Sequence, residues 1–224
     1  MENNVFFTSD LHVGHFNILK YCPNRLAAIG LTLDQALDDR ERAITLMNEY
    51  ILDVWNSTVR DNDEVYLLGD CKISGSETNK KVLSQLNGKK HLILGNHDKD
   101  KGIFSLFESV DSLTERVFLP SSFPFLNGDK FGVVMCHYPM LTWNHRAYGW
   151  AQVHGHCHGS IDGLNRKSGE LRVDVGFDGS LGQMELVSHE NLYNFFKTIA
   201  HSEGCEDLLS YASGQIKSKD DGLI

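Results

Sequence analysis

Short clusters of Asp, His and Asn residues follow successive apolar segments of the chain, and this pattern constrains the fold more than any other feature. In chain order the clusters are Asp10-Leu11-His12, Gly69-Asp70, Gly95-Asn96-His97-Asp98, Cys136-His137 and His154-Gly155-His156-Cys157-His158. Each cluster comes directly after a segment with the composition of a buried strand. Open α/β sheets bind ligands in the crevice outside the carboxyl ends of their strands. We therefore expect the clusters to converge on one site.

Apolar and β-branched segments predict the strands. These segments are residues 4–9, 64–68, 91–94, 117–119, 130–136, 151–153, 170–175 and 184–187. Helical segments separate the strands in the first hundred residues, and strands alternating with helices indicate a parallel sheet with right-handed crossovers. The second half of the chain contains fewer helical segments.

Apolar residues at helical spacing predict helices over residues 16–21, 79–86 and 188–199. Pro23 is expected to stop the first of them, because proline cannot continue a helix. Thr32 and Gln35 form a capping box, and one continuous apolar stripe follows it as far as Trp55.

One domain accounts for the chain. Hydrophobic residues make up 41% of the 224 residues and charged residues 23%, a balance that excludes a largely disordered protein. No internal repeat or linker composition divides the sequence. We expect a single domain over residues 1–201, followed by a polar, partly mobile tail over residues 202–224.

Charge and cysteine content limit the compartment and the partners. The formal net charge of −9 argues against long nucleic acid as an obligate partner, although a small phosphorylated substrate such as a nucleotide remains compatible. The apolar runs are too short to cross a membrane, and the start of the chain does not resemble a secretory signal. Five dispersed cysteines suit reduced thiols, so we expect a cytoplasmic protein. The oligomeric state stays open.

The clusters carry metal-ligand residue types. Extended geometry would place both side chains of Asp10-x-His12 on one side of the backbone, and likewise both side chains of His156-x-His158. Each cluster alone has an ordinary structural explanation, such as a turn or a buried histidine. Their joint occurrence at strand ends is very improbable as coincidence. Carboxylate and imidazole together suit Mn, Fe or Zn.

The order Asp-x-His, Gly-Asp, Gly-Asn-His-Asp, His and Gly-His-x-His resembles the calcineurin-like metallophosphoesterase family. Residues 7–10, 136–139 and 155–159 resemble a branch of small bacterial and phage phosphoesterases within it. The resemblance implies an α/β (α+β) protein, a four-layer αββα sandwich in which two mixed β-sheets are flanked by helices. It also implies a two-metal site at the edge of the sheets.

The resemblance assigns roles to individual residues. It implies seven metal ligands, with Asp10, His12 and His158 on one ion, Asn96, His137 and His156 on the other, and Asp70 bridging both. It further implies that His97 contacts a phosphate oxygen and protonates the leaving alkoxide, while Asp98 hydrogen-bonds the His97 imidazole. Asn96 and His97 would also bind the substrate.

The function implied is that of a phosphoesterase dependent on two divalent metal ions (Mn, Fe or Zn). It would hydrolyse a small phosphate mono- or diester by in-line attack of a metal-bridging hydroxide. Alternatives are a nuclease or cyclic-nucleotide phosphodiesterase with the same site, or a non-catalytic binding or scaffold protein that keeps the fold. Intact His97 and Asp98 argue against the scaffold. Cys71-Lys72 after the second cluster, with no Asp-Arg-Gly, argues against a protein serine/threonine phosphatase.

Several further residues are close to the clusters in sequence. His154 is expected beside the metal ligands rather than among them. His15 and Asn17 can reach the substrate from the loop after Asp10. The polar-aromatic loop from Trp143 to Tyr148 either stacks a nucleoside or covers the edge of the core, and the sequence does not decide between these roles.

Overall fold

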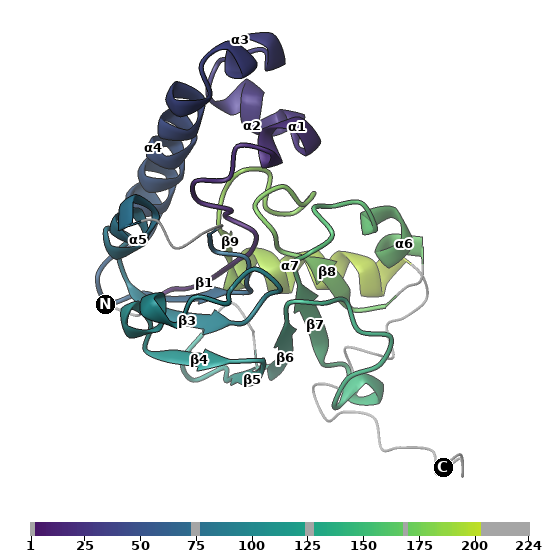
Figure 1. The fold of residues 1–224 in the computed structure, drawn as a ribbon. Helices are drawn as coiled ribbons and strands as arrows, with labels where there is room; N and C mark the ends of the chain where they lie inside the picture. The colour runs from purple at the N-terminus through teal and green to yellow at the C-terminus, as the bar shows by residue number, and fades with distance from the viewer. Residues whose placement is uncertain (1–2, 73–76, 124–127, 168–169, 203–224) are drawn as a thin grey trace.

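Two β-sheets with helices around them form the fold (Figure 1). The computed structural model describes residues 3–72, 77–123, 128–167 and 170–202. The strands are β1 (Val5–Thr8), β2 (Glu64–Leu67), β3 (Lys89–Ile93), β4 (Ser109–Asp111), β5 (Leu113–Phe118), β6 (Phe131–Cys136), β7 (Ala151–His154), β8 (Arg172–Asp174) and β9 (Val187–Ser188). The α-helices are α1 (Ile18–Tyr21), α2 (Pro23–Ala28), α3 (Leu33–Asp38), α4 (Arg40–Thr58), α5 (Glu77–Ser84), α6 (Asp162–Lys167) and α7 (His189–Ser202). The described residues also form the 3₁₀ helices η1 (Lys101–Leu106) and η3 (Arg146–Tyr148).

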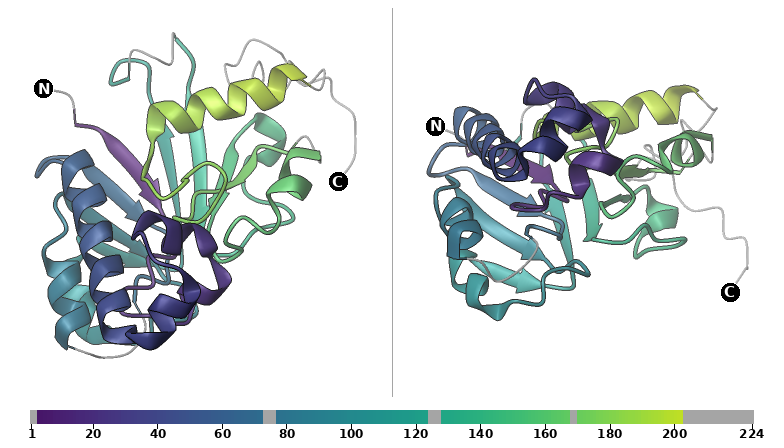
Figure 2. Two further views of the ribbon diagram at one scale, coloured as in Figure 1. Left: turned by 90° about the horizontal axis from the view of Figure 1, so that it is seen from above. Right: turned by 45° about the horizontal axis from the view of Figure 1, so that its top comes forward.

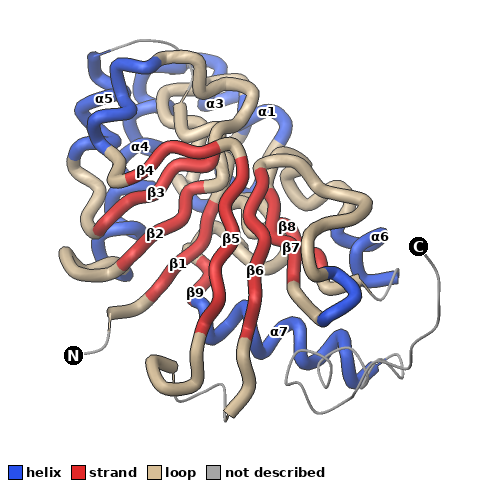
Figure 3. Tube along the Cα trace, turned by 90° about the horizontal axis from the view of Figure 1, so that it is seen from below, coloured by secondary structure: helices blue, strands red, loops and turns tan. Residues whose placement is uncertain are grey.

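Both sheets are mixed. The first has the order β4-β3-β2-β1-β9, in which β1 to β4 pair in parallel and the edge strand β9 runs antiparallel to β1. The second has the order β5-β6-β7-β8, in which only β5 and β6 pair antiparallel. The predicted parallel sheet over the first hundred residues is confirmed. Figure 3 shows the two sheets beside each other, with α6 next to the edge strand β8.

Strand β1 divides its side chains between two cores. Phe6 packs with residues of helices α1 to α5, including Met47 and Trp55. Val5 and Phe7 point to the other face and join a core shared by both sheets. Because neighbouring side chains of a strand alternate between faces, one short apolar strand can close both cores. This explains why residues 5–8 are all buried.

Helix α7 completes the core between the sheets. It contributes Leu192, Tyr193, Phe196 and Ile199 to the same cluster as Phe131 of β6. Figure 2 shows α7 away from helices α1, α2 and α3, so it does not crowd the ends of the strands where the polar clusters are found. The helix predicted over residues 188–199 is confirmed.

The first predicted helix ends before Pro23, as expected, because α1 ends at Tyr21. Pro23 also begins α2, a helix that was not predicted, at the first position, where proline's missing N–H is not needed. One helix prediction in the first half was wrong. The single stripe expected up to Trp55 is interrupted at Asp39, whose side chain accepts the Arg42 N–H at 3.0 Å and caps α4. Aspartate favours such caps because its side chain competes with the backbone for hydrogen bonds. The capping box of Thr32 and Gln35 is confirmed at the start of α3.

Other differences are smaller. Strand β4 and helix α6 were not predicted, and the last predicted strand is reduced to β9. The predicted tail lies outside the described residues, apart from Ser202 at the end of α7. Among the described residues, no helix combines the length and the apolar character needed to span a bilayer.

Asp39→Ala removes the N-cap of α4, the longest described helix, and we expect it to lower the free energy of unfolding by about 1 kcal/mol. Urea denaturation followed by circular dichroism measures this change. Asp38→Ala is the matched control, because Asp38 is equally exposed and is the last residue of α3 rather than a cap. Equal effects of both substitutions would show that the cap does not stabilise the helix.

Candidate metal centre

Backbone hydrogen bonds bring the clusters together at the carboxyl ends of the strands. The loop after β1 is joined to the loop after β2 by the Asp10 N–H, which donates to Gly69 O at 3.0 Å. The loop after β7 is joined to the end of β6 by the Gly155 N–H, which donates to His137 O at 3.0 Å. A bond from the His156 N–H to Asp10 Oδ2 at 2.8 Å connects the two sheets. The predicted convergence of the clusters is therefore present.

Asp10, His12 and His158 form the first group of candidate ligands. One ligand atom from each lies within 4.8 Å of the others. Asp10 Oδ1 is 3.9 Å from His12 Nε2 and 3.8 Å from His158 Nε2. The carboxylate and His12 are buried, and His158 closes the group from the second sheet. These are the residues assigned to one ion from the sequence.

Asp70, His137 and His156 form the second group, again with ligand atoms within 4.8 Å of one another. Asp70 Oδ2 is 3.7 Å from His137 Nε2. Asn96 joins this group, because its Oδ1 lies 3.1 Å from His137 Nε2. The other nitrogen of His137 pairs with Leu68 O at 2.7 Å, which fixes the orientation of the ring. This matches the second predicted ligand set.

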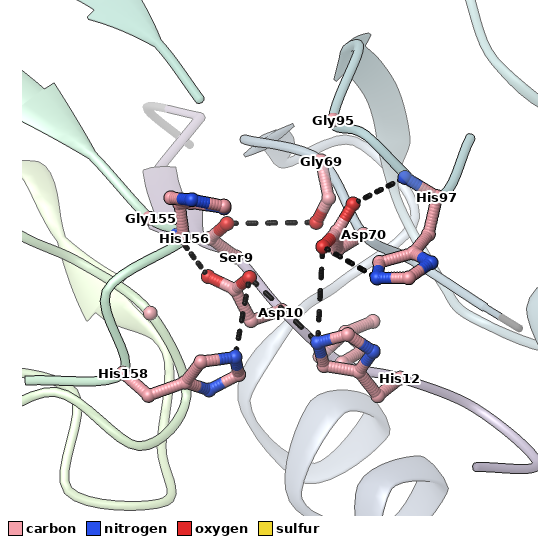
Figure 4. Close-up of polar contacts among 12 residues, drawn as sticks. Ser9, Asp10, His12, Gly69, Asp70, Gly95, His97, Gly155, His156 and His158 are labelled. Atoms are coloured by element: carbon pink, nitrogen blue, oxygen red, sulfur yellow. Dashed lines mark hydrogen bonds and ion pairs between the residues drawn. The ribbon is translucent and has the colours of Figure 1, made fainter. Parts of the chain in front are cut away.

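Asp70 of the second group is also close to the first, and Figure 4 shows its carboxylate facing His12 and His97. Its Oδ2 is also 3.9 Å from His12 Nε2 of the first group and 3.9 Å from His97 Nε2. Its other oxygen accepts the His97 backbone N–H at 2.8 Å, so Oδ2 faces the imidazoles. This is the place that a ligand shared by two cations would take.

Orphaned polar atoms test whether a cation fits here. Asp10 Oδ1 and both ring nitrogens of His12 are buried and have no hydrogen-bond partner among the described residues. Buried polar atoms are nearly always paired, because an unpaired one costs desolvation energy. Carboxylate and imidazole atoms left unpaired within 4 Å of each other suit a divalent cation of the Mn, Fe or Zn type. The residues therefore fit the predicted cofactor.

The backbone of the candidate ligands is strained. Positive φ values between 47° and 68° occur at five of the seven, namely Asp10, His12, Asp70, His156 and His158. A residue other than glycine costs about 1–3 kcal/mol in such sparsely populated regions and persists only where the surroundings hold it. The extended geometry predicted for Asp10-x-His12 and His156-x-His158 is wrong. The side chains converge because the chain turns sharply after each strand.

Two glycines permit this close packing. A Cβ atom at Gly155 would lie 1.9 Å from Ser9 Oγ and 2.4 Å from Asp10 Oδ2. One at Gly95 would lie 2.4 Å from Asp70 Oδ1. Asp10 and Asp70 are themselves candidate ligands, so they cannot move away without disturbing the centre. Gly95 of Gly-Asn-His-Asp and Gly155 of Gly-His-x-His are thus required because a larger residue would collide with the carboxylates of Asp70 and Asp10.

Asp98 has a different role from the one predicted. Its Oδ2 accepts the backbone N–H groups of Asp70 at 2.7 Å and Gly95 at 2.9 Å. Its Oδ1 accepts the N–H of Cys71 at 3.1 Å and the thiol of Cys71 at 2.8 Å. With both oxygens engaged, the predicted hydrogen bond to the His97 imidazole is not formed. Asp98 instead fixes the loop that carries Asp70.

Arg25 and Asp178 were missed from the sequence. Arg25 is fully buried and donates to the carbonyls of Leu11 at 2.8 Å and Asp10 at 2.6 Å. It also makes a two-point contact with Asp178, at 2.8 Å and 2.7 Å. Asp178 Oδ2 in turn pairs with His158 Nδ1 at 2.8 Å. Asp178 follows β8 as the other clusters follow their strands, and that position is the signal that could have found it.

These contacts set the protonation of the first group. Burial lowers the pKa of His12 to about 2, so its ring is neutral and carries a free electron pair. Burial also acts to lower the pKa of His158, but its hydrogen bonds with Asp178 and Cys22 and the charges of Asp10 and Asp178 together outweigh burial and raise the pKa to about 10. Burial raises the pKa of Asp10 to about 6, against the attraction of His158. The charge on Asp178 is held by Arg25, which counteracts burial and lowers its pKa.

The remaining predicted residues surround this centre. His97 is 44% exposed at its mouth. His15 lies against the His12 ring at 5.3 Å, whereas Asn17 is exposed at the start of α1. His154 is buried and pairs with Gly155 O and Asn165, beside the candidate ligands, as predicted.

Trp143 covers the core, which is one of the two predicted roles of its loop. It is buried, and its Nε1 donates to Trp150 O at 2.7 Å. Tyr148 of the same loop is exposed, and its ring lies against His145 at 5.9 Å.

Sequence comparison relates the chain to phage and archaeal proteins. The Gene 66 protein of Mycobacterium phage L5 is 32% identical over 231 residues, which cover 90% of this chain and 98% of that protein. The chain belongs to the family of this Gene 66 protein. The uncharacterized protein MJ1445 of Methanocaldococcus jannaschii is 30% identical over 177 residues, covering 76% of this chain and 81% of that one. The Gene 66 protein of Mycobacterium phage D29 is 27% identical over 195 residues, with 79% and 88% covered.

A solved structure shares the fold. The protein of unknown function AQ665 from Aquifex aeolicus superposes with a TM-score of 0.59 at 18% identity, covering 86% of this chain and 99% of its own. No family model matches the chain. The names of these relatives carry no activity, so the chemistry must be argued from the residues of the centre.

Arg25→Met tests the buried ion pair behind the first group. Removing Arg25 breaks the buried pair with Asp178 and leaves the buried carbonyls of Leu11 and Asp10 without their donor, so we expect a loss of about 3–5 kcal/mol in the free energy of unfolding. Urea denaturation in the presence of a chelator measures the loss without a contribution from bound metal. The double variant Arg25→Met/Asp178→Asn should regain part of it, because the buried charge is gone.

Arg42→Met is the control for Arg25→Met, because Arg42 is exposed on α4. A loss below about 1 kcal/mol for Arg25→Met, the range of exposed ion pairs, would show that the pair does not stabilise the fold.

Proposed function

We propose that this protein is a phosphoesterase that uses two divalent cations to hydrolyse a small phosphate ester. The single observation that carries the proposal is the pair of Asp/His groups, one around Asp10 and one around Asp70, with the Asp70 carboxylate between them. Two adjacent cations are the arrangement by which many phosphatases and nucleases act at phosphorus. Two mixed sheets flanked by helices agree with the αββα sandwich of calcineurin-like metallophosphoesterases, the fold we propose for the chain.

The cations are proposed to be Mn, Fe or Zn. Asp10, His12 and His158 would hold one, His137, His156 and Asn96 the other, and Asp70 both. When bound, they would supply Lewis acidity towards the phosphoryl oxygens and an activated water as the nucleophile. No thiol is needed. Burial raises the pKa of Cys71, and the nearby Asp98 adds to the effect, so this thiol stays protonated and serves as a hydrogen-bond donor.

His97 is the proposed general acid. Its imidazole lies at the open side of the centre, 3.9 Å from Asp70 Oδ2, and its backbone N–H is fixed by the same carboxylate. From there it can reach the leaving oxygen of an ester whose phosphoryl group lies between the two Asp/His groups. Asn96 is adjacent and can orient a phosphate oxygen. A binding or scaffold protein would gain nothing from an exposed imidazole held in this place, which favours an enzyme.

Asp70→Asn tests the proposed metal dependence. We expect at least about a 100-fold loss of kcat on an aryl phosphate ester, together with a fall in bound metal, because the shared charged ligand is removed. Elemental analysis gives the metal content and a chromogenic assay the rate. Asp61→Asn, at an exposed turn, is the control. Unchanged turnover with unchanged metal content would contradict the bridging role of Asp70.

Chelation should also lower the melting temperature. A ligand that binds only the folded chain at 100 times its Kd stabilises it by about 2.7 kcal/mol, or roughly 5–10 °C for a domain of this size. Calorimetry with and without a chelator measures the shift, and Asp70→Asn should show a smaller one. If metal is shown to leave and the melting curve does not move, binding and folding are not coupled.

His97→Ala separates the acid from the metal ligands. We expect about a 10²–10⁴-fold loss in kcat on alkyl phosphate esters, whose leaving groups need a proton. Nitrophenyl esters leave without one, so they should lose much less and serve as the internal control. Comparing the two esters with the same preparation decides the matter, and equal losses would remove His97 from the acid role.

A further inference from the structure

Tyr138 borders the candidate metal centre and presents its ring to solvent. The ring centroid is 4.9 Å from that of His137 and 4.8 Å from that of His156, with interplanar angles of 77° and 65°. The residue is nevertheless 45% exposed. The ring therefore packs against two candidate ligands while part of its surface remains open.

Buried polar side chains hold the Tyr138 segment in place. Gln152 of β7 is fully buried, and its amide contacts both Tyr138 O and the Met140 N–H at 3.4 Å. Arg172 of β8 is also buried and donates to Met140 O at 2.6 Å. Two strands thus use buried polar groups to fix the backbone that follows His137. A surface fixed in advance loses little conformational freedom when a ligand packs on it.

The other aromatic side chains of this region are not available in the same way. Trp143 is buried, and the exposed ring of Tyr148 lies against His145 rather than against a candidate ligand. Leu141, in the segment that carries Tyr138, is exposed and adds apolar surface. Among the described Phe, Tyr and Trp residues with ring contacts to the candidate ligands, Tyr138 is exposed.

We propose that Tyr138 determines specificity by stacking against a planar aromatic group on the phosphate ester, of which a nucleobase is the biological example. The inference rests on the proposed function, since it places the phosphoryl group at the Asp/His groups next to this ring. Aromatic faces stack on bases without regard to their hydrogen-bonding pattern, so the platform selects for a flat ring rather than for one base. A phosphate ester without a ring gains nothing from it.

The test compares two esters that differ in the ring. Tyr138→Ala should lower kcat/KM for adenosine 5′-monophosphate roughly 5- to 100-fold, mainly through KM, the range found for removing one base–aromatic stack. For glycerol phosphate we expect a change within about twofold, because no stack is lost. Tyr138→Phe keeps the face of the ring and should restore the rate on adenosine 5′-monophosphate. Tyr148→Ala is the matched control, an exposed tyrosine away from the candidate ligands.

Two outcomes would overturn the inference. Equal losses on both esters would mean that Tyr138 only supports His137 and His156, and an unchanged KM for adenosine 5′-monophosphate would mean that no ring packs there.

A binding experiment separates this inference from the proposed function. Adenosine and inorganic phosphate are titrated separately by NMR, the first with chelator present and the second with Mn²⁺.

Tyr138→Ala should weaken the binding of adenosine and leave that of inorganic phosphate unchanged. If the wild-type protein hydrolyses neither ester but shows this difference, the proposed function fails and the platform stands. If adenosine binds equally to both proteins, the platform fails, whatever the turnover.

Discussion

Five candidate ligands occupy left-handed backbone conformations, and the rest of the centre depends on holding them there. Left to itself, a chain would relax these residues, because each costs of the order of 1–3 kcal/mol. The surrounding hydrogen bonds prevent this. Asp98 holds the N–H of Asp70, and the side chain of Asp10 holds the N–H of His156. Each of these two carboxylates accepts a backbone N–H from another cluster, so the clusters hold one another in place.

Arg25 extends the same principle across the molecule. Its guanidinium joins the carbonyls of Asp10 and Leu11 to Asp178, and Asp178 orients His158. These contacts lead back to Asp10, because His158 Nε2 lies 3.8 Å from Asp10 Oδ1. Helix α2 lies far from His158 in sequence, and Arg25 connects the two through Asp178. A buried arginine is tolerable here because each contact satisfies one of its donors.

The sequence predicts the parts of this structure that follow local rules. Strand composition and the polar residues after each strand were enough to place all seven candidate ligands at one edge, as found. The starts of α2 at Pro23 and of α4 after Asp39 were not predicted, because a residue that follows one helix can equally begin or cap the next. The roles of Asp98 and Arg25 depend on backbone groups from distant segments. The spacing of residues along the sequence does not predict such contacts. The family resemblance implies a hydrogen bond from Asp98 to the His97 imidazole. In the structure, Asp98 instead accepts the backbone N–H groups of Asp70, Gly95 and Cys71.

Burial is distributed unevenly over the centre, and this asymmetry indicates how a substrate approaches. Asp10 and His12 are enclosed, whereas His97, His156 and Tyr138 remain exposed. In the proposed phosphoesterase, an ester would approach from the side of these exposed residues, with its phosphoryl end directed inward. The groups that discriminate between substrates belong on that open side, because a side chain as enclosed as His12 meets every substrate alike. If the proposed function holds, residues at the mouth can vary the specificity while the enclosed residues preserve the proposed phosphate site.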